Sequence, residues 1–344
     1  MLNFEINERL FHFKRPAGTS RGVYTTRKSW FVTITDGERT GVGECAPLPN
    51  LSCDDIEDYE KVLRNLCANF SVTGQINYEM LRPYPSMLFG IETALLSLEK
   101  GNRLFDTPFS RGEEGIPFNG LIWMGSFDEM RQQVDEKIRQ GVRCIKIKIG
   151  AIDFNEELEL IKYIRQLFSK EELELRVDAN GAFGFNEAAE KLEILSHYDI
   201  HSIEQPIKSR QWKEMAALCN YSKIPIALDE ELIGINIYAM KRQMLEIINP
   251  RYIVLKPSLH GGMRGVREWV DIADALGIGS WITSALESNI GLNAVAHLAA
   301  DIYGPDITFH QGLGTGMLFH DNIEMPLYVR DSKMFYDMNG GKVF

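Results

Sequence analysis

Polar side chains recur at a regular spacing in the second half of the chain, each near the end of a short apolar run. They stand 30, 26, 25, 27 and 28 residues apart, in the order Lys148, Asp178, Glu204, Asp229, Lys256 and Ser284. Each interval is about the length of one strand plus one helix, so the pattern indicates repeated βα units with parallel strands. Because the carboxyl ends of such strands share one face of a barrel, we expect these side chains to meet there.

Three members of this series are carboxylates, and they would come from successive strands. Unpaired carboxylates that lie close together repel and raise one another's pKa values. A hard divalent cation removes that conflict, and three oxygen ligands with open positions suit Mg²⁺, with Mn²⁺ as the alternative. The sequence therefore predicts a metal site made by Asp178, Glu204 and Asp229.

Two lysines lie on one face of a strand that we expect to be buried. The segment CIKIKIG, residues 144–150, alternates isoleucine with Lys146 and Lys148, and strand side chains point to opposite faces with period two. A desolvated lysine close to other cations has a lowered pKa and can act as a base. A metal that holds a substrate carboxylate stabilises the charge formed when the adjacent carbon loses a proton. The predicted chemistry is therefore proton abstraction from a small-molecule carboxylate substrate.

Each of these residues has an ordinary structural interpretation when it is taken alone. A single lysine on a strand is usually an exposed surface group, and a carboxylate after a strand can cap the following helix. Lysines and carboxylates gathered at one barrel face favour a site over several separate structural roles. A barrel that has lost catalysis and only binds a ligand is the alternative from another class, and the intact lysines and carboxylates argue against it.

The elements that must position these groups alternate from about residue 116. Eight short apolar strands are expected, with amphipathic helices between them, at 116–124, 144–150, 174–181, 200–206, 224–231, 252–258, 279–288 and 307–313. This count predicts a closed barrel of parallel strands with helices outside. A doubly wound sheet is the competitor, but it needs a glycine-rich phosphate loop after its first strand, and IWMGSFDEM offers one glycine.

The N-terminal part has a different pattern, which predicts a separate α+β domain. Residues 29–47 indicate a hairpin with a D-G turn. Residues 52–70 and 87–101 indicate helices, the first of them capped by Ser52. The expected domains are a barrel over 113–317 and a cap over 1–112 that is joined by 318–344.

Composition excludes several classes of partner. The formal net charge is -11, from 48 acidic and 37 basic residues, which argues against nucleic acid or an anionic membrane as partner. Five scattered cysteines form no C-x-x-C pair, so the sequence predicts neither a zinc site nor a disulfide framework. Neither a signal peptide nor a membrane span is expected, and we expect a cytoplasmic protein. The sequence does not set the oligomeric state.

Five motifs in this order give the chain a family resemblance. KIKIG, RVDAN, IEQP, ALDEE and VLKPS resemble the motifs of the muconate-lactonising branch of the enolase superfamily. Within that branch, ITSALESNIGLNAVAHLAA followed by HQGLGTGMLF resembles o-succinylbenzoate synthases. The resemblance implies an α/β fold, a modified TIM barrel of (β/α)7β type with an α+β capping domain. It also implies a lyase that dehydrates 2-succinyl-6-hydroxy-2,4-cyclohexadiene-1-carboxylate on the menaquinone pathway.

The resemblance also implies roles for individual residues. Lys148 matches the family's base, which takes the proton and then protonates the departing hydroxyl on the same face. Lys256 matches the lysine on the opposite face, and Lys146 matches a residue that holds the substrate carboxylate. The family's metal ligands match Asp178, Glu204 and Asp229. The remaining predicted substrate-binding residues belong to a mobile cap loop and to the pocket for the succinyl end, and they are Ser20, Arg21, Thr283, Ser284, Gly312, Leu313 and Gly314.

Other activities of the same superfamily stay open at this point. N-succinylamino acid racemases and dipeptide epimerases use lysines on both faces of the substrate carbon. Dipeptide epimerases tend to carry an acidic D-x-D pair after the eighth strand, where this chain has QGLGTGM. Muconate cycloisomerases are less similar near the seventh strand. The resemblance therefore favours dehydration without excluding racemisation.

Overall fold

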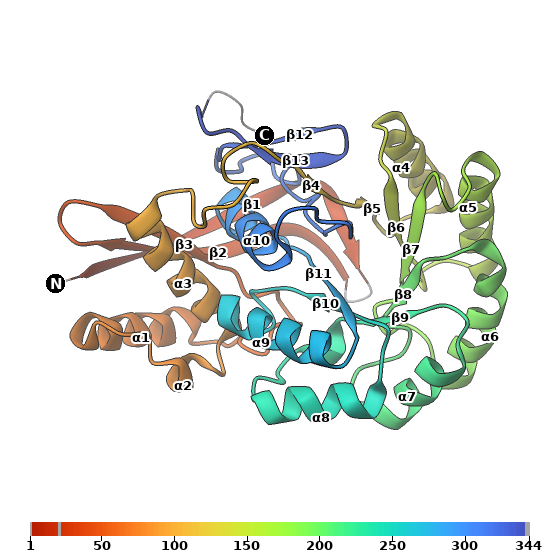
Figure 1. The fold of residues 1–344 in the computed structure, drawn as a ribbon, viewed down its shortest axis with the longest axis horizontal. Helices are drawn as coiled ribbons and strands as arrows, with labels where there is room; N and C mark the ends of the chain where they lie inside the picture. Colours follow the sequence, from red (N-terminus) through yellow and green to blue (C-terminus); the bar gives the residue numbers. More distant parts are fainter. Residues whose placement is uncertain (1, 20–21, 341–344) are drawn as a thin grey trace.

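In this computed structural model, residues 2–19 and 22–340 are described, and they form three β-sheets with helices around them. Figure 1 shows the cap, coloured red to orange, on one side of a barrel whose helices α4 to α9 form an arc around its strands. Ser20 and Arg21, which the sequence predicts to bind substrate, lie outside the described residues.

The cap is an antiparallel sheet covered by helices. Its sheet has the order β1 (Asn3–Thr19), β2 (Gly22–Thr35) and β3 (Thr40–Cys45). Its helices are α1 (Tyr59–Thr73), α2 (Tyr78–Leu81) and α3 (Pro85–Lys100). A Cβ at Gly43 would stand 1.9 Å from the carbonyl oxygen of Gly90, so glycine at this position lets α3 pack directly on β3.

One cap prediction is confirmed and another is wrong. The predicted hairpin is present, since β2 pairs with β3 from Trp30–Cys45 to Thr35–Thr40. The first helix does not start at Ser52: it begins at Tyr59 with Asp58 as its N-cap. The Ser52 hydroxyl instead accepts a hydrogen bond from the Leu48 N–H at 2.7 Å, so this residue stabilises a turn before the helix.

Seven parallel strands form the curved central sheet, in the order β11-β10-β9-β8-β7-β6-β5. The strands are β5 (Gly120–Ile122), β6 (Cys144–Lys148), β7 (Glu174–Asp178), β8 (Ser202–Glu204), β9 (Ile226–Leu228), β10 (Tyr252–Leu255) and β11 (Gly279–Ile282). The connecting helices are α4 (Phe127–Arg139), α5 (Phe154–Leu167), α6 (Phe185–Leu195), α7 (Trp212–Tyr221), α8 (Tyr238–Ile248), α9 (Gly262–Ala275) and α10 (Asn289–Tyr303), with short 3-10 helices η1 (Ser196–Tyr198) and η2 (Glu230–Leu232). The predicted α/β barrel with a cap is confirmed.

The two ends of the predicted strand series differ from expectation. Residues 307–313 form no regular strand, but Gly312 bridges Thr283 beside β11, and Gln311 bridges Phe118 just before β5. These two parallel bridges connect the edges of the seven-stranded sheet. The first predicted strand is broken, because β4 (Ile116–Pro117) pairs outside the barrel and only β5 joins it.

The C-terminal segment touches both parts of the molecule. The N–H of Lys14 donates to the Leu318 carbonyl at 2.8 Å, which places this segment along β1 of the cap. Farther along, β12 (Leu327–Arg330) and β13 (Lys333–Tyr336) form a sheet with β4 at the start of the barrel. The domain boundaries at residues 112 and 318 stay predictions.

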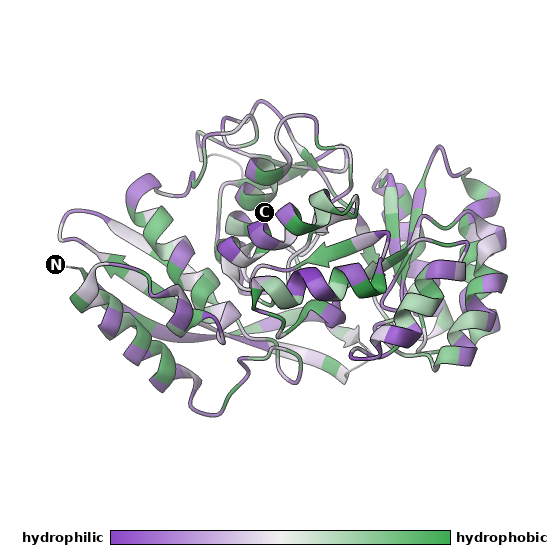
Figure 2. Cartoon of the chain, turned by 60° about the horizontal axis from the view of Figure 1, so that its bottom comes forward, coloured by the Kyte–Doolittle hydropathy of each residue, from purple (hydrophilic) through white to green (hydrophobic). Residues whose placement is uncertain are grey.

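The core of the barrel lies between its strands and its outer helices. Ile145, Ile147 and Ile149 are fully buried in this cluster, so the lysines that alternate with them face the barrel interior. Figure 2 shows hydrophobic and hydrophilic residues alternating along the outer helices, as expected for helices with one buried face. No helix in the described part of the chain is long and apolar enough to cross a membrane.

Two buried carboxylates of the cap bind the N-termini of barrel helices. Glu44 on β3 accepts hydrogen bonds from the backbone N–H groups of Ser288 and Gly291 at the start of α10, both at 3.0 Å. Glu92 on α3 accepts from the N–H of Met263 at 2.5 Å at the start of α9. Helix N-termini leave N–H groups unpaired and favour negative charge, so these contacts fix the cap on the barrel.

Candidate active site

The strands bring the predicted lysines and carboxylates to one end of the barrel. In the parallel register, Lys148 stands opposite Asp178, and Asp178 stands opposite Glu204. Asp229 directly follows β9, the next strand. All four side chains are buried. The βα spacing of the sequence therefore placed these groups at a common height.

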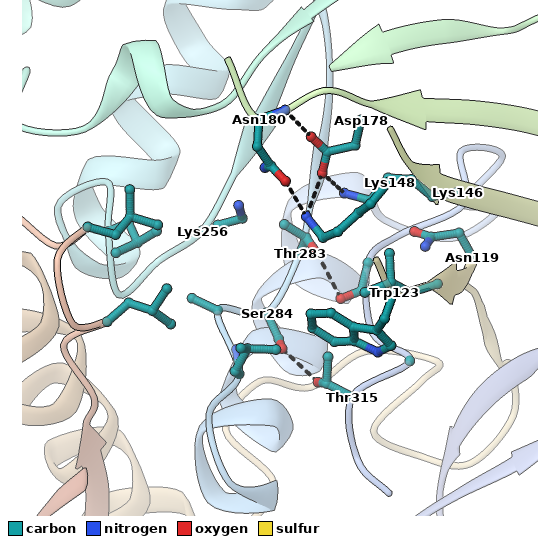
Figure 3. Close-up of a pocket in the computed structure, with 18 of the residues that line it drawn as sticks. Asn119, Trp123, Lys146, Lys148, Asp178, Asn180, Lys256, Thr283, Ser284 and Thr315 are labelled. Carbon is teal, nitrogen blue, oxygen red and sulfur yellow. Dashed lines mark hydrogen bonds and ion pairs between the residues drawn. The ribbon is translucent and has the colours of Figure 1, made fainter. Parts of the chain in front are cut away.

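The lysines flank the carboxylates on both sides. Lys148 ends β6 and Lys256 follows β10, and the strands between them in the sheet are β7, β8 and β9. Asp178 ends β7, Glu204 ends β8 and Asp229 directly follows β9. A substrate carbon above the carboxylates would therefore be approached by one amine from each side, and Figure 3 shows Lys148 and Lys256 entering the cavity from different strands.

Ion pairs connect the amines to the carboxylates. Lys146 Nζ lies 2.8 Å from Glu204 Oε2 and 3.3 Å from Asp178 Oδ2. Lys148 Nζ lies 3.0 Å from the same Asp178 oxygen. Lys256 Nζ forms an ion pair with Asp229 Oδ2. Charged hydrogen bonds of this kind hold flexible lysine side chains in one orientation.

Asn180 gives Lys148 a second contact. Its side-chain oxygen accepts a hydrogen bond from Lys148 Nζ at 2.6 Å, and its amide nitrogen donates to Glu230 Oε1 at 3.0 Å. Its backbone has a φ of 45°, a left-handed conformation that asparagine tolerates better than most residues. The backbone N–H of Asn180 also donates to Asp178 Oδ1 at 3.0 Å. Asn180 therefore aims Lys148 into the cavity.

Burial and neighbouring charge shift the pKa values of these groups in opposite directions. Burial and the nearby Asp178 carboxylate raise the pKa of Glu204 to about 8. Burial also acts to raise the pKa of Asp178, but Lys148 and neighbouring ammonium groups outweigh it and hold that pKa well below its usual range. Burial acts to lower the pKa of Lys256, but Asp229 outweighs it, so that pKa is raised. Lys256 is therefore a cation at neutral pH.

The residues at this end of the barrel fit a divalent cation. Glu204 Oε1 and Asp229 Oδ1 are buried without a hydrogen-bond partner in the described structure. A buried carboxylate oxygen without a partner is unfavourable, and a hard cation would satisfy both atoms. The raised pKa of Glu204 agrees, because added positive charge would favour its ionised form.

The three carboxylates are more widely spread than a closed metal site. Among the described residues, the group of three whose ligand atoms lie within 4.8 Å of one another is Cys144, Glu174 and His310, at the opposite end of the barrel. There, Arg176 Nε already lies 2.6 Å from Glu174 Oε1. The end of the barrel that holds Asp178, Glu204 and Asp229 is called the mouth. There, Lys146 forms ion pairs with two of the carboxylates, Asp178 and Glu204.

A cavity of about 90 Å³ opens above the lysines and carboxylates. Of the residues predicted from sequence, it is lined by Lys146, Lys148, Asp178, Lys256, Thr283, Ser284, Gly312 and Gly314. Glu204 and Asp229 lie just beneath, bonded to lining lysines. Figure 3 shows Ser284 on the side of the cavity away from Asp178, with Thr283 between Ser284 and Lys148.

The predicted loop residues 312–314 have different positions. Gly312 lies against Thr283, where a Cβ would stand 1.7 Å from the Thr283 hydroxyl oxygen, so only glycine lets these two segments pair. Leu313 does not line the cavity: it is fully buried in the barrel core, because residues that alternate along an extended segment face opposite sides. A role for its backbone amide in binding substrate stays a prediction.

Sequence reasoning missed several residues of the cavity wall. Tyr24, Leu48 and Leu51 reach it from the cap, and Asn119 and Thr315 reach it from the barrel. The cap residues carry no periodic signal, since their contact with the barrel depends on how the two parts dock. Thr315 had a usable signal, because it follows the glycine-rich segment that was predicted to line the pocket.

Comparisons with known proteins agree with this geometry. Residues 129–335 match the family Enolase C-terminal domain-like, and residues 19–98 match MenC, N-terminal domain. The sequence is 44% identical to the o-succinylbenzoate synthase of Desulfotalea psychrophila, over 92% of this chain and 94% of that protein. The crystal structure of MenC from the same organism superposes with a TM-score of 0.82 and 38% identity, covering 97% of this chain and 99% of that one.

A more distant structure shares the fold. The muconate lactonizing enzyme from Pseudomonas fluorescens has a TM-score of 0.80 at 21% identity, covering 97% of this chain and 93% of that one. Barrel, cap and matched families define an enzyme of the enolase superfamily. Within that superfamily, the chain belongs to the o-succinylbenzoate synthase family. The family resemblance read from the sequence motifs is thereby confirmed.

Proposed function

We propose that this chain is a Mg²⁺-dependent o-succinylbenzoate synthase. It removes water from 2-succinyl-6-hydroxy-2,4-cyclohexadiene-1-carboxylate and forms 2-succinylbenzoate, a step of menaquinone biosynthesis. The observation that carries the proposal is the placement of three carboxylates on β7 to β9 between lysines on β6 and β10. The 44% identity to a protein named o-succinylbenzoate synthase supports the choice of substrate.

The cation site is assigned to Asp178, Glu204 and Asp229. Their buried positions and the two partnerless oxygens support this assignment. A cation bound there would offset the negative charge on the substrate carboxylate as the adjacent carbon loses its proton. Lys146, bonded to Glu204 and Asp178, adds a fixed positive charge on the same side.

Lys148 is assigned as the base. Its amine, oriented by Asp178 and Asn180, takes the proton from the ring carbon that bears the carboxylate. The same ammonium then returns that proton to the departing hydroxyl, which leaves as water while the ring becomes aromatic. Lys256 stays protonated on the other face and stabilises the negative charge that the substrate carries between these two steps.

Turnover by the purified protein tests this proposal. Mixing it with the hydroxycyclohexadiene substrate and Mg²⁺ should remove the diene absorbance and yield 2-succinylbenzoate. A chelator should stop the reaction, and added Mg²⁺ should restore it. Absence of turnover with Mg²⁺ present, or turnover that the chelator leaves unchanged, would reject the proposal.

N-succinylamino acid racemisation is the second candidate. The placement of lysines on both sides of the carboxylates favours it, because racemisation needs one amine on each face of the carbon. Dipeptide epimerisation is less well supported, since residues 311–317 contain no acid for a substrate amine. Incubating the protein with an N-succinyl-L-amino acid in deuterated water, and measuring deuterium uptake with loss of optical rotation, distinguishes racemisation from dehydration.

A further inference from the structure

A buried arginine of the cap lies directly behind one wall of the cavity. Arg27 on β2 is 2% exposed. Among the described residues, its guanidinium donates to carbonyl oxygens alone: to Ala46 at 2.6 Å, to Pro47, and to Leu286 at 3.2 Å and Ala285 at 3.4 Å. One planar group therefore joins a cap loop, residues 46–51, to a barrel loop, residues 283–288.

Both loops line the cavity, whereas Arg27 does not. Leu48 and Leu51 come from the cap loop, and Ser284 and Leu286 come from the barrel loop. Ser284, which belongs to this wall, lies on the side of the cavity away from Asp178 (Figure 3). The spacing between these side chains therefore depends on Arg27, which does not line the cavity.

The barrel loop needs such support because its backbone is strained. Leu286 has a φ of 65°, a conformation that residues other than glycine and asparagine rarely adopt. Glu287 holds one side of the turn, accepting from the Ala285 N–H at 2.7 Å and from the Ser258 hydroxyl at 2.5 Å. Arg27 holds the other side through the Leu286 carbonyl.

The charge of Arg27 is balanced within the same region. Burial lowers the pKa of its guanidinium, and the carboxylates of Glu287 and Glu44 counteract that effect. Glu44 bonds across the cap–barrel junction to the Ser288 N–H, and Glu287 bonds within the barrel to the Ser258 hydroxyl. Arg27 is therefore buried at this junction with carboxylates close enough to compensate its charge.

We infer that Arg27 is a positioning residue that determines specificity: it holds the cap loop and the barrel loop at the spacing that receives the substrate chain extending away from the carboxylates. This inference rests on the proposed function, in which that chain is the succinyl group. Loosening the wall weakens substrate binding and leaves proton transfer at Lys148 largely intact.

Arg27→Lys tests this inference, because lysine keeps the charge but cannot join four carbonyls in one plane. We expect KM to rise about 10-fold, with kcat changed less than about 3-fold, since the loss affects substrate placement. Inhibition by 2-succinylbenzoate should weaken by a similar factor. The rise in thermal midpoint on adding Mg²⁺ should be unchanged.

Arg165→Lys is a matched control. Arg165 on α5 also donates only to carbonyls, those of Leu173, Tyr198 and Asp199, each at 2.9 Å, and it lines no part of the cavity. This variant should lose stability with KM unchanged. The control separates the general effect of breaking an arginine–carbonyl cluster from the specific effect of breaking the cluster of Arg27.

The outcomes separate this inference from the proposed function. If the unmodified protein does not turn over the substrate, the proposed function fails. If it does and Arg27→Lys keeps its KM, or loses kcat at unchanged KM, the inference is overturned. Arg27→Gln serves as the second variant if the lysine variant does not fold. Failure of both to fold while Arg165→Lys folds would show that Arg27 serves folding alone.

Discussion

The two ends of the barrel both contain buried charge, but they handle it differently. Strand β7 contributes to both, with Glu174 and Arg176 near its start and Asp178 at its end. At the start, Glu174 is paired with Arg176 and lies 3.5 Å from His310 Nδ1. Among the described residues, the buried side-chain atoms without a hydrogen-bond partner are nitrogens at the start, Arg176 Nη2 and His310 Nδ1, and carboxylate oxygens at the mouth, Glu204 Oε1 and Asp229 Oδ1.

The difference supports the proposal that the cluster at the mouth binds a ligand while the cluster at the start stabilises the fold. Burial acts to raise the pKa of Glu174, but the neighbouring His310 and the charge of Arg176 outweigh it and hold that pKa well below its usual range. Glu204 shows the reverse, a raised pKa in spite of Lys146 beside it. Both oxygens of Glu174 have charged or polar neighbours, whereas carboxylate oxygens left without partners are more typical of a ligand site.

Removal of the proposed base, Lys148, should cause the largest loss of activity. Lys148→Ala should lower the dehydration rate by about 10³-fold or more, because among the described residues no other amine is bonded by both Asp178 and Asn180. Steady-state kinetics with the diene substrate measure this. Lys162→Ala, an exposed lysine on α5 paired with Glu159, is the control and should keep full activity. Activity within tenfold of the unmodified protein would rule out Lys148.

Breaking the ion pair at the other end should affect stability rather than turnover. Arg176→Met leaves Glu174 without its main cation and should lower the free energy of unfolding by about 3 kcal/mol at neutral pH. Urea denaturation measures the loss, and kcat per folded molecule should be unchanged. Arg242→Met, an exposed residue bonded to Glu246, should cost much less. A fall in kcat without loss of stability would place Arg176 in the catalytic machinery.

Addition of metal should distinguish the two ends directly. At a Mg²⁺ concentration about 100 times the dissociation constant, a ligand that binds only the folded state adds about 2.7 kcal/mol of stability. The thermal midpoint should therefore rise by several degrees in the unmodified protein and in Arg176→Met. Asp229→Asn should lose this rise. A rise that survives in Asp229→Asn would move the cation site away from the three carboxylates.

The pH dependence of the Arg176→Met effect is the smallest expected difference. The pKa of Glu174 is lower in the folded state than its usual 4.5, so the pair contributes stability above that pH and loses it as the pH falls further. The stability gap between the unmodified protein and Arg176→Met should thus be full at neutral pH and should shrink at about pH 4. Urea denaturation at both values measures it, and a gap that stays constant would contradict the ionic interpretation.

The barrel site was predictable because its information is local. Each of Lys148, Asp178, Glu204, Asp229 and Lys256 ends or directly follows a strand, and equal βα lengths put them at one height. The Ser52 prediction failed because a serine before an acidic run fits a helix cap and a turn equally well, and the bond to Leu48 decided between them.

The rest of the wall could not be predicted for a different reason. Leu48, Leu51 and Arg27 acquire their roles through contacts with residues more than 200 positions away. Arg27 lies within TTRKSWFVTIT, where it resembles any charged residue of a half-exposed strand. Leu313 was assigned to the pocket with its neighbours, although alternation along the segment directs it into the core.

Glu44 and Glu92 have a consequence for how such enzymes diversify. Each is a cap residue that completes the first turn of a barrel helix, α10 and α9 respectively. A cap transplanted from a relative would supply new wall residues, but it would also have to bring acids that meet these same two helix ends. These two acids therefore restrict which caps can dock on this barrel, whereas changes in the loops of one cap can alter the cavity wall without breaking these contacts.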